Sequence, residues 1–93
     1  VNIAPAELDN LICAHADIAE AAVAGYPCEV MGERVAAFVV PKSGLDLSLE
    51  ALTDYLKSRH IATFKLPEKL IMVEALPRNP LGKVVRQRLI ELL

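Results

Sequence analysis

The stretch Arg34-Val35-Ala36-Ala37-Phe38-Val39-Val40 holds six apolar residues in succession and is closed by Pro41. A continuous apolar run of this length is typical of a strand that is covered on both faces, whereas a strand with one face in water alternates apolar and polar residues. We therefore predict a strand over Arg34–Val40, with other elements packed on it.

Two further segments are predicted to be strands. Ile18–Ala24 is short and apolar, and the turn-forming residues Gly25-Tyr26-Pro27 are expected to end it. Its alanines make the segment ambiguous by propensity alone, but its length favours a strand. Lys69–Ala75, after Pro67, is predicted to be the third strand.

Three segments have helical spacing, namely Pro5–His15, a stretch from the N-cap Ser48 to about Arg59, and Val84–Leu93. Their apolar stripes are Leu8, Leu11 and Ile12, then Leu49, Leu52 and Leu56, and finally Val85, Leu89 and Leu93. Leu76–Gly82 contains two prolines and one glycine, so a loop is expected there. The order α-β-β-α-β-α predicts a small α+β domain, a sheet of about three strands with packed helices.

Composition narrows the class of protein. The chain has 93 residues, of which 54% are hydrophobic and 24% charged, and this excludes an intrinsically disordered chain. No apolar run approaches the roughly 18 residues of a membrane span, and the sequence from Val1 shows no basic-then-apolar leader pattern, so secretion is not expected. Cys13 and Cys28 form no zinc-type spacing, so no metal site is predicted. We expect one soluble, cytoplasmic domain over residues 1–93.

The net charge of −2 conceals a division along the chain. Residues 1–54 carry nine acidic and two basic side chains, a net charge of −7, whereas residues 55–93 carry eight basic and three acidic ones, a net charge of +5. This asymmetry suggests that the second half faces an anionic partner. The alternative is a pair of oppositely charged faces that only keep the domain soluble.

Lys83 lies directly after Gly82 and before the last predicted helix, with Arg86 and Arg88 close behind. Cations near a helix N-terminus oppose the macrodipole, so stability alone would favour acidic residues there. Cations and a helix N-terminus together would suit a phosphate or a carboxylate, and Gly82 would permit close approach of the backbone. The alternative is that Lys83 is a solvated loop lysine.

Leu76-Pro77-Arg78-Asn79-Pro80-Leu81-Gly82-Lys83-Val84 resembles the C-terminal signature of the acyl-adenylate-forming enzymes, Leu-Pro-(Arg/Lys)-x-x-x-Gly-Lys-(Val/Ile). Four other segments are similar to motifs of that family and occur in the same order, over residues 1–9, 15–23, 32–40 and 64–68. Ala16 and Cys28 depart from the family pattern at positions that carry no chemistry. The resemblance covers essentially the whole chain and implies the small mobile C-terminal domain of such an enzyme.

The resemblance also implies roles for individual residues. Lys83 matches the family lysine that reaches the substrate carboxylate and the α-phosphate during adenylation, on a loop supported by Gly82. Asn2 and Ile3 would line the pantetheine tunnel in the second pose of the domain. Basic residues of the second half would meet the phosphates of CoA, with Lys65 and Arg86 as candidates and Arg78 and Arg88 left open.

The implied reaction joins a carboxylic acid to CoA at the expense of ATP, through an acyl adenylate and pyrophosphate. ATP, Mg²⁺ and the acid would be held by a large N-terminal domain absent from this chain, so the fragment alone should be inactive. One alternative is an adenylation domain that loads a carrier protein, and another is a stand-alone anion-binding regulatory module. Four aromatic residues and a negative net charge argue against nucleic-acid binding.

Overall fold

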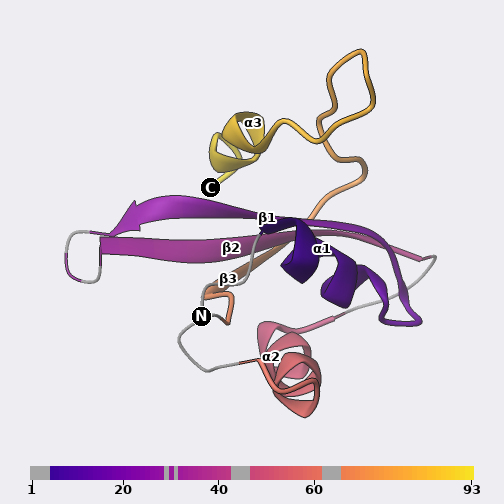
Figure 1. Ribbon diagram of the computed structural model, residues 1–93, viewed down its shortest axis with the longest axis vertical. Helices are drawn as coiled ribbons and strands as arrows, with labels where there is room; N and C mark the ends of the chain where they lie inside the picture. The colour runs from indigo at the N-terminus through magenta and orange to yellow at the C-terminus, as the bar shows by residue number, and fades with distance from the viewer. Residues whose placement is uncertain (1–4, 29, 31, 43–46, 62–65) are drawn as a thin grey trace.

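The computed structural model describes residues 5–28, 30, 32–42, 47–61 and 66–93. Its helices and strands occur in the order α-β-β-α-β-α, which confirms the predicted α+β class and the predicted order of elements (Figure 1). They are α1 (Pro5–Cys13), β1 (Ile18–Cys28), β2 (Gly32–Pro41), α2 (Leu49–Ser58), β3 (Lys69–Met72) and α3 (Arg86–Ile90).

The three strands form one sheet in the order β1-β2-β3. β1 and β2 are antiparallel, with a register that runs from Ile18 opposite Pro41 to Cys28 opposite Gly32. β2 and β3 are parallel, and α2 lies in the connection between them, as parallel pairing requires. β2, which contains the apolar run, is therefore the central strand.

Both faces of β2 are buried, as the apolar run predicts. Ala37 and Val39 belong to a core shared with α1 and α2, whose buried members are Leu8, Ile12, Leu52 and Leu56. Ala36 and Phe38 belong to a second core with Leu76 and Leu89, on the face covered by α3. Figure 1 shows α1 and α2 on one side of the sheet and α3 on the other. The domain thus has two thin cores separated by one sheet.

The predicted end of β1 is wrong, because Gly25-Tyr26-Pro27 continues the strand to Cys28. All three residues are paired with β2, with Pro27 opposite Glu33. Val23, four residues before Pro27, directs its N–H away from β2 to Asp9, and alternate residues of a strand face the same way. The missing N–H of Pro27 is therefore on the open edge, where proline is tolerated.

The predicted bounds hold for the second helix, α2, but the first and third helices are shorter than predicted. Ser48 is the N-cap of α2, and its hydroxyl oxygen accepts the N–H of Ala51 at 3.0 Å, which confirms the predicted start. α1 ends at Cys13 rather than His15.

The largest error concerns the last helix, which spans only Arg86–Ile90 instead of Val84–Leu93. Val84 is paired with Arg78 in an isolated antiparallel bridge, and this pairing removes it from the helix. β3 is likewise shorter than predicted and ends at Met72, although Val73 donates one more hydrogen bond to Val39.

Candidate functional site

The segment 76–85 leaves the sheet after β3 and returns as a narrow loop before α3 (Figure 1). Its two arms are joined by backbone hydrogen bonds, from the N–H of Asn79 to the carbonyl of Lys83 and from the N–H of Val85 to the carbonyl of Pro77, both at 2.9 Å. We call this segment the Lys83 loop. It is a closed hairpin, so its shape is set by its own backbone.

Asn79 and Gly82 shape the tip of the Lys83 loop. The Oδ1 of Asn79 accepts the N–H groups of Leu81 at 2.9 Å and of Lys83 at 3.0 Å. Gly82 has a φ of +87°, and no atom lies within 4 Å of the place where a Cβ would stand. Glycine is therefore required here for the backbone conformation and not for space.

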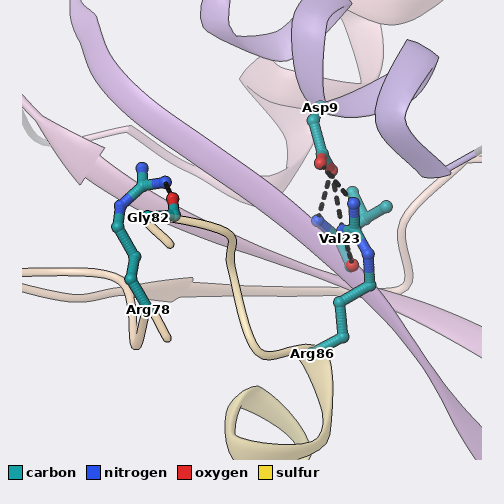
Figure 2. Close-up of polar contacts among 5 residues, drawn as sticks. All are labelled: Asp9, Val23, Arg78, Gly82 and Arg86. Carbon is teal, nitrogen blue, oxygen red and sulfur yellow. Dashed lines mark hydrogen bonds and ion pairs between the residues drawn. The ribbon is translucent and has the colours of Figure 1, made fainter. Parts of the chain in front are cut away.

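Arg78 ties the Lys83 loop to itself and to the sheet. Its Nη1 donates to the carbonyl of Gly82 at 2.8 Å, and its Nη2 pairs with Oε1 of Glu20 on β1 at 2.5 Å (Figure 2 shows the first contact). Both side chains of the ion pair are 41% exposed. The Arg78 cation is therefore engaged within the domain.

Arg86, at the other end of the loop, is also engaged within the domain (Figure 2). Its Nη2 lies 2.7 Å from Oδ2 of Asp9 on α1, and its Nη1 donates to the carbonyl of Val23 on β1 at 2.6 Å. The sequence suggested that Arg86 meets CoA phosphates. That contact stays a prediction, and the structure assigns the Arg86 guanidinium an internal role.

Lys83 differs from both arginines. It is exposed, and its side chain has no hydrogen bond or ion pair with any residue that the structure describes. The arrangement therefore places a cation without an internal partner on a loop of fixed shape. Such a cation can meet an anion on another molecule at little cost in loop ordering.

Lys83 does not lie directly before a helix, contrary to the prediction from the sequence. α3 begins at Arg86, three residues beyond Lys83, and has only five residues. The lysine is thus held by the hairpin and not by a helix N-terminus. Asn79 and Glu20 were missed by the sequence analysis, because their contacts depend on how the loop folds back. Asn2, Ile3 and Lys65 lie outside the described residues.

The part of the chain that the structure describes contains no group of three or more His, Cys, Asp or Glu side chains that could hold a metal ion. Its helices are also too short to cross a bilayer. Among these residues the Lys83 loop is therefore our candidate site.

Comparison with known proteins bears directly on this loop. The family model of the AMP-binding enzyme C-terminal domain matches residues 7–83, so the match extends from α1 to Lys83. The fatty acid–acyl-carrier-protein ligase ScoC of Streptomyces coeruleorubidus is 42% identical over 88 residues, which are 95% of this chain and 17% of ScoC. The long-chain-fatty-acid–CoA ligase FadD13 of Mycobacterium tuberculosis (strain H37Rv) is 40% identical over 85 residues, 91% of this chain and 16% of FadD13.

A solved structure gives the same assignment. The crystal structure of apo MatB from Rhodopseudomonas palustris superposes with a TM-score of 0.88 at 37% identity, covering 99% of this chain and 18% of MatB. The chain thus spans less than a fifth of the length of each of these proteins. Since sequence and fold agree from α1 to the Lys83 loop, the chain belongs to the family of AMP-binding enzyme C-terminal domains.

Proposed function

We propose that this chain is the C-terminal domain of an ATP-dependent acyl-CoA ligase and that it supplies Lys83 for adenylation. The observation that carries the proposal is the Lys83 ammonium, which has no internal partner among the described residues and lies on a hairpin closed by its own hydrogen bonds. The family match supports it, as do relatives named as ligases of CoA or of an acyl carrier protein.

The proposed chemistry needs a cation at this position. In adenylation a carboxylate oxygen attacks the α-phosphorus of ATP, and the bond from that phosphorus to the pyrophosphate oxygen breaks. Two anions approach each other, and negative charge builds on the phosphoryl oxygens. A positioned ammonium stabilises this transition state more than the separated reactants. Lys83 acts through its charge and transfers no proton in this scheme.

In the second half-reaction the CoA thiol attacks the carbonyl carbon of the acyl adenylate, and AMP leaves. We infer that the domain turns another face toward the larger domain for this step. By resemblance that face includes Asn2 and Ile3 beside the pantetheine, with Lys65 as the candidate for the CoA phosphates, because the Arg86 guanidinium is already engaged by Asp9 and Val23. Lys83 would then be withdrawn from the reacting atoms, so the two half-reactions should depend on it differently.

Magnesium belongs to the larger domain in this proposal. The described residues offer no cluster of ligands for it, as noted above. The ion would be held there together with the ATP phosphates.

Half-reaction assays of the full-length protein test the proposal. Replacing Lys83 with alanine should strongly slow formation of the acyl adenylate but spare its reaction with CoA. An equal loss in both steps would contradict the role assigned to Lys83.

A matched pair of glycine variants tests whether the shape of the Lys83 loop matters. Gly82 and Gly32 both have positive φ values, +87° and +81°, and at neither residue does any atom lie within 4 Å of the point that a Cβ would occupy. Each change to alanine should therefore lower the free energy of unfolding by a similar amount, about 1 kcal/mol. Only Gly82→Ala should also slow adenylation, by roughly 10-fold, because displacing a reacting group is costly.

The measurements are urea unfolding and acid-dependent pyrophosphate release by the full-length protein. Gly32 lies at the start of β2 and plays no part in the Lys83 loop. Equal slowing of adenylation by both variants would show that lost stability alone explains the Gly82→Ala result.

A second candidate function is supported by ScoC, which is named as a ligase for an acyl carrier protein and is as similar to this chain as FadD13. The two functions differ only in the thiol that accepts the acyl group. Full-length protein supplied with acyl adenylate should form a thioester with free CoA. Thioester formation with a carrier protein's pantetheine thiol, but not with CoA, would select the alternative.

A further inference from the structure

On the outer edge of β1, side chains from α1 and α3 form hydrogen bonds with the backbone of Val23. β1 is an edge strand, so backbone groups that point away from β2 have no neighbouring strand. The N–H of Val23 instead donates to Oδ1 of Asp9 at 2.8 Å, and its carbonyl accepts Nη1 of Arg86 at 2.6 Å. One acidic and one basic side chain thus satisfy both edge groups of a single residue (Figure 2).

Asp9 and Arg86 also bind each other as a two-point pair. Nη2 of Arg86 lies 2.7 Å from Oδ2 of Asp9, and Nη1 lies 3.2 Å from Oδ1. The Asp9 side chain is 15% exposed and that of Arg86 34%. Paired, charge-assisted hydrogen bonds of this geometry fix the orientation of the two side chains and also stabilise their contact. Residues 77 positions apart thereby join α1, β1 and α3 at one point.

α3 needs such an anchor. It has five residues, and its N-cap Val85 makes no side-chain capping bond. So short a helix does not define its own start, because helical stability comes from tertiary contacts at this length. Leu89, the fourth of its five residues, packs into the second core. Arg86 is its first residue, three positions after Lys83, and the contacts of Arg86 with Asp9 and Val23 hold this end of the helix.

The opposite arm of the Lys83 loop has a more exposed polar attachment. Leu76 is buried in the second core, and the ion pair of this arm joins Arg78 to Glu20, with both side chains 41% exposed. Ion pairs that accessible to water contribute little to stability. The contact of Arg86 with Asp9 and Val23 is more buried and has more hydrogen bonds, so it is the better determinant of where the loop meets the sheet.

We propose that Arg86 and Asp9 are positioning residues for adenylation, which fix the Lys83 loop on the edge of β1 so that the ammonium reaches the reacting phosphate. This proposal rests on the function proposed above. It gives Arg86 a role that acts through Lys83 and needs no contact with CoA. Neither residue touches the reacting atoms.

The test uses Arg86→Lys and Asp9→Asn in the full-length enzyme. Lysine keeps the charge of Arg86 but cannot form the two-point pair. Asparagine keeps an acceptor for the Val23 N–H but loses the charge that holds Arg86. Each variant should lower kcat for adenylation by about 10- to 100-fold, as expected for a displaced catalytic group. KM for ATP and for the acid, and the reaction of supplied acyl adenylate with CoA, should change by no more than about 2-fold.

Arg34→Lys is the matched control. Arg34 also pairs with one carboxylate, Glu68, and those side chains are 30% and 48% exposed, similar to Arg86 on the arginine side. The pair joins the start of β2 to the residue before β3, away from the Lys83 loop. Arg34→Lys should leave adenylation within about 2-fold of wild type, since it changes only the geometry of an exposed ion pair outside the Lys83 loop.

Combination with Lys83→Ala shows whether the effect passes through the lysine. If it does, Arg86→Lys should cause no further loss of adenylation in a protein that already lacks the ammonium. A further loss of about 10-fold, an equal loss in both half-reactions, or an equal effect of Arg34→Lys would each overturn the positioning role.

Two other outcomes would be interpreted differently. If Lys83→Ala itself left adenylation intact, the proposed function would fail and not merely the positioning role. If Arg86→Lys lowered the yield of folded protein, Asp9→Asn would serve as the test, with thermal melting to show that it is folded. Folded Asp9→Asn with wild-type adenylation would overturn the proposal.

Discussion

Lys83→Ala in the full-length enzyme is expected to slow acyl-adenylate formation by about 10²–10³-fold, the loss typical of removing one preorganised charge-stabilising group. The same variant should convert supplied acyl adenylate and CoA to thioester at close to the wild-type rate. The reason is that the ammonium meets the negative charge that develops at the α-phosphorus during adenylation, whereas in the second step the domain turns another face and Lys83 is withdrawn from the reacting atoms. Rapid-quench measurement of each half-reaction separates the two steps.

Two control variants sharpen this experiment. Lys57→Ala removes another exposed lysine, on α2, and should leave both half-reactions unchanged. Lys83→Arg retains the charge but changes the size and geometry of the cation, so intermediate activity is expected. If Lys83→Arg were as slow as Lys83→Ala, the shape of the ammonium would matter beyond its charge. If Lys57→Ala were equally slow, the effect would not be specific to the Lys83 loop.

The second large effect is a complete loss of adenylation when the chain is assayed without the rest of the enzyme. The 93 residues should form no detectable acyl adenylate from ATP and a carboxylic acid, because in the function proposed above the larger domain holds both substrates. Circular dichroism and thermal melting first establish that the isolated chain is folded. Mass spectrometry for the acyl adenylate then provides the activity measurement.

Adding the separate chain to an enzyme that lacks this domain also tests whether adenylation needs both domains. An enzyme truncated before Val1 should be inactive, and the separate chain should restore only a small fraction of adenylation, since a tether supplies an effective concentration in the millimolar range. Any restoration should disappear when the added chain carries Lys83→Ala. Tight binding of phosphate-bearing ligands by the chain alone would instead favour the stand-alone anion-binding module.

The site was predictable only in part. Charge patterning drew attention to the basic half of the chain but left a solvated lysine as the alternative. The resemblance of residues 76–84 to a family signature singled out Lys83, and the structure shows how the loop holds it. Asp9 contacts Arg86 across 77 positions, so no local pattern could indicate that pair. Arg86 looked like a free cation in the sequence for the same reason.

The fold, like the site, was predictable only in part. The six apolar residues after Arg34 determined a strand buried on both faces, and Ser48 determined the start of α2, because backbone propensity and capping act within a few residues. Only the tertiary structure decided that β1 runs through Pro27 and that α3 starts as late as Arg86. Those boundaries depend on partners, namely the pairing of β1 with β2 and of Val84 with Arg78, and the energies of such contacts exceed local preference.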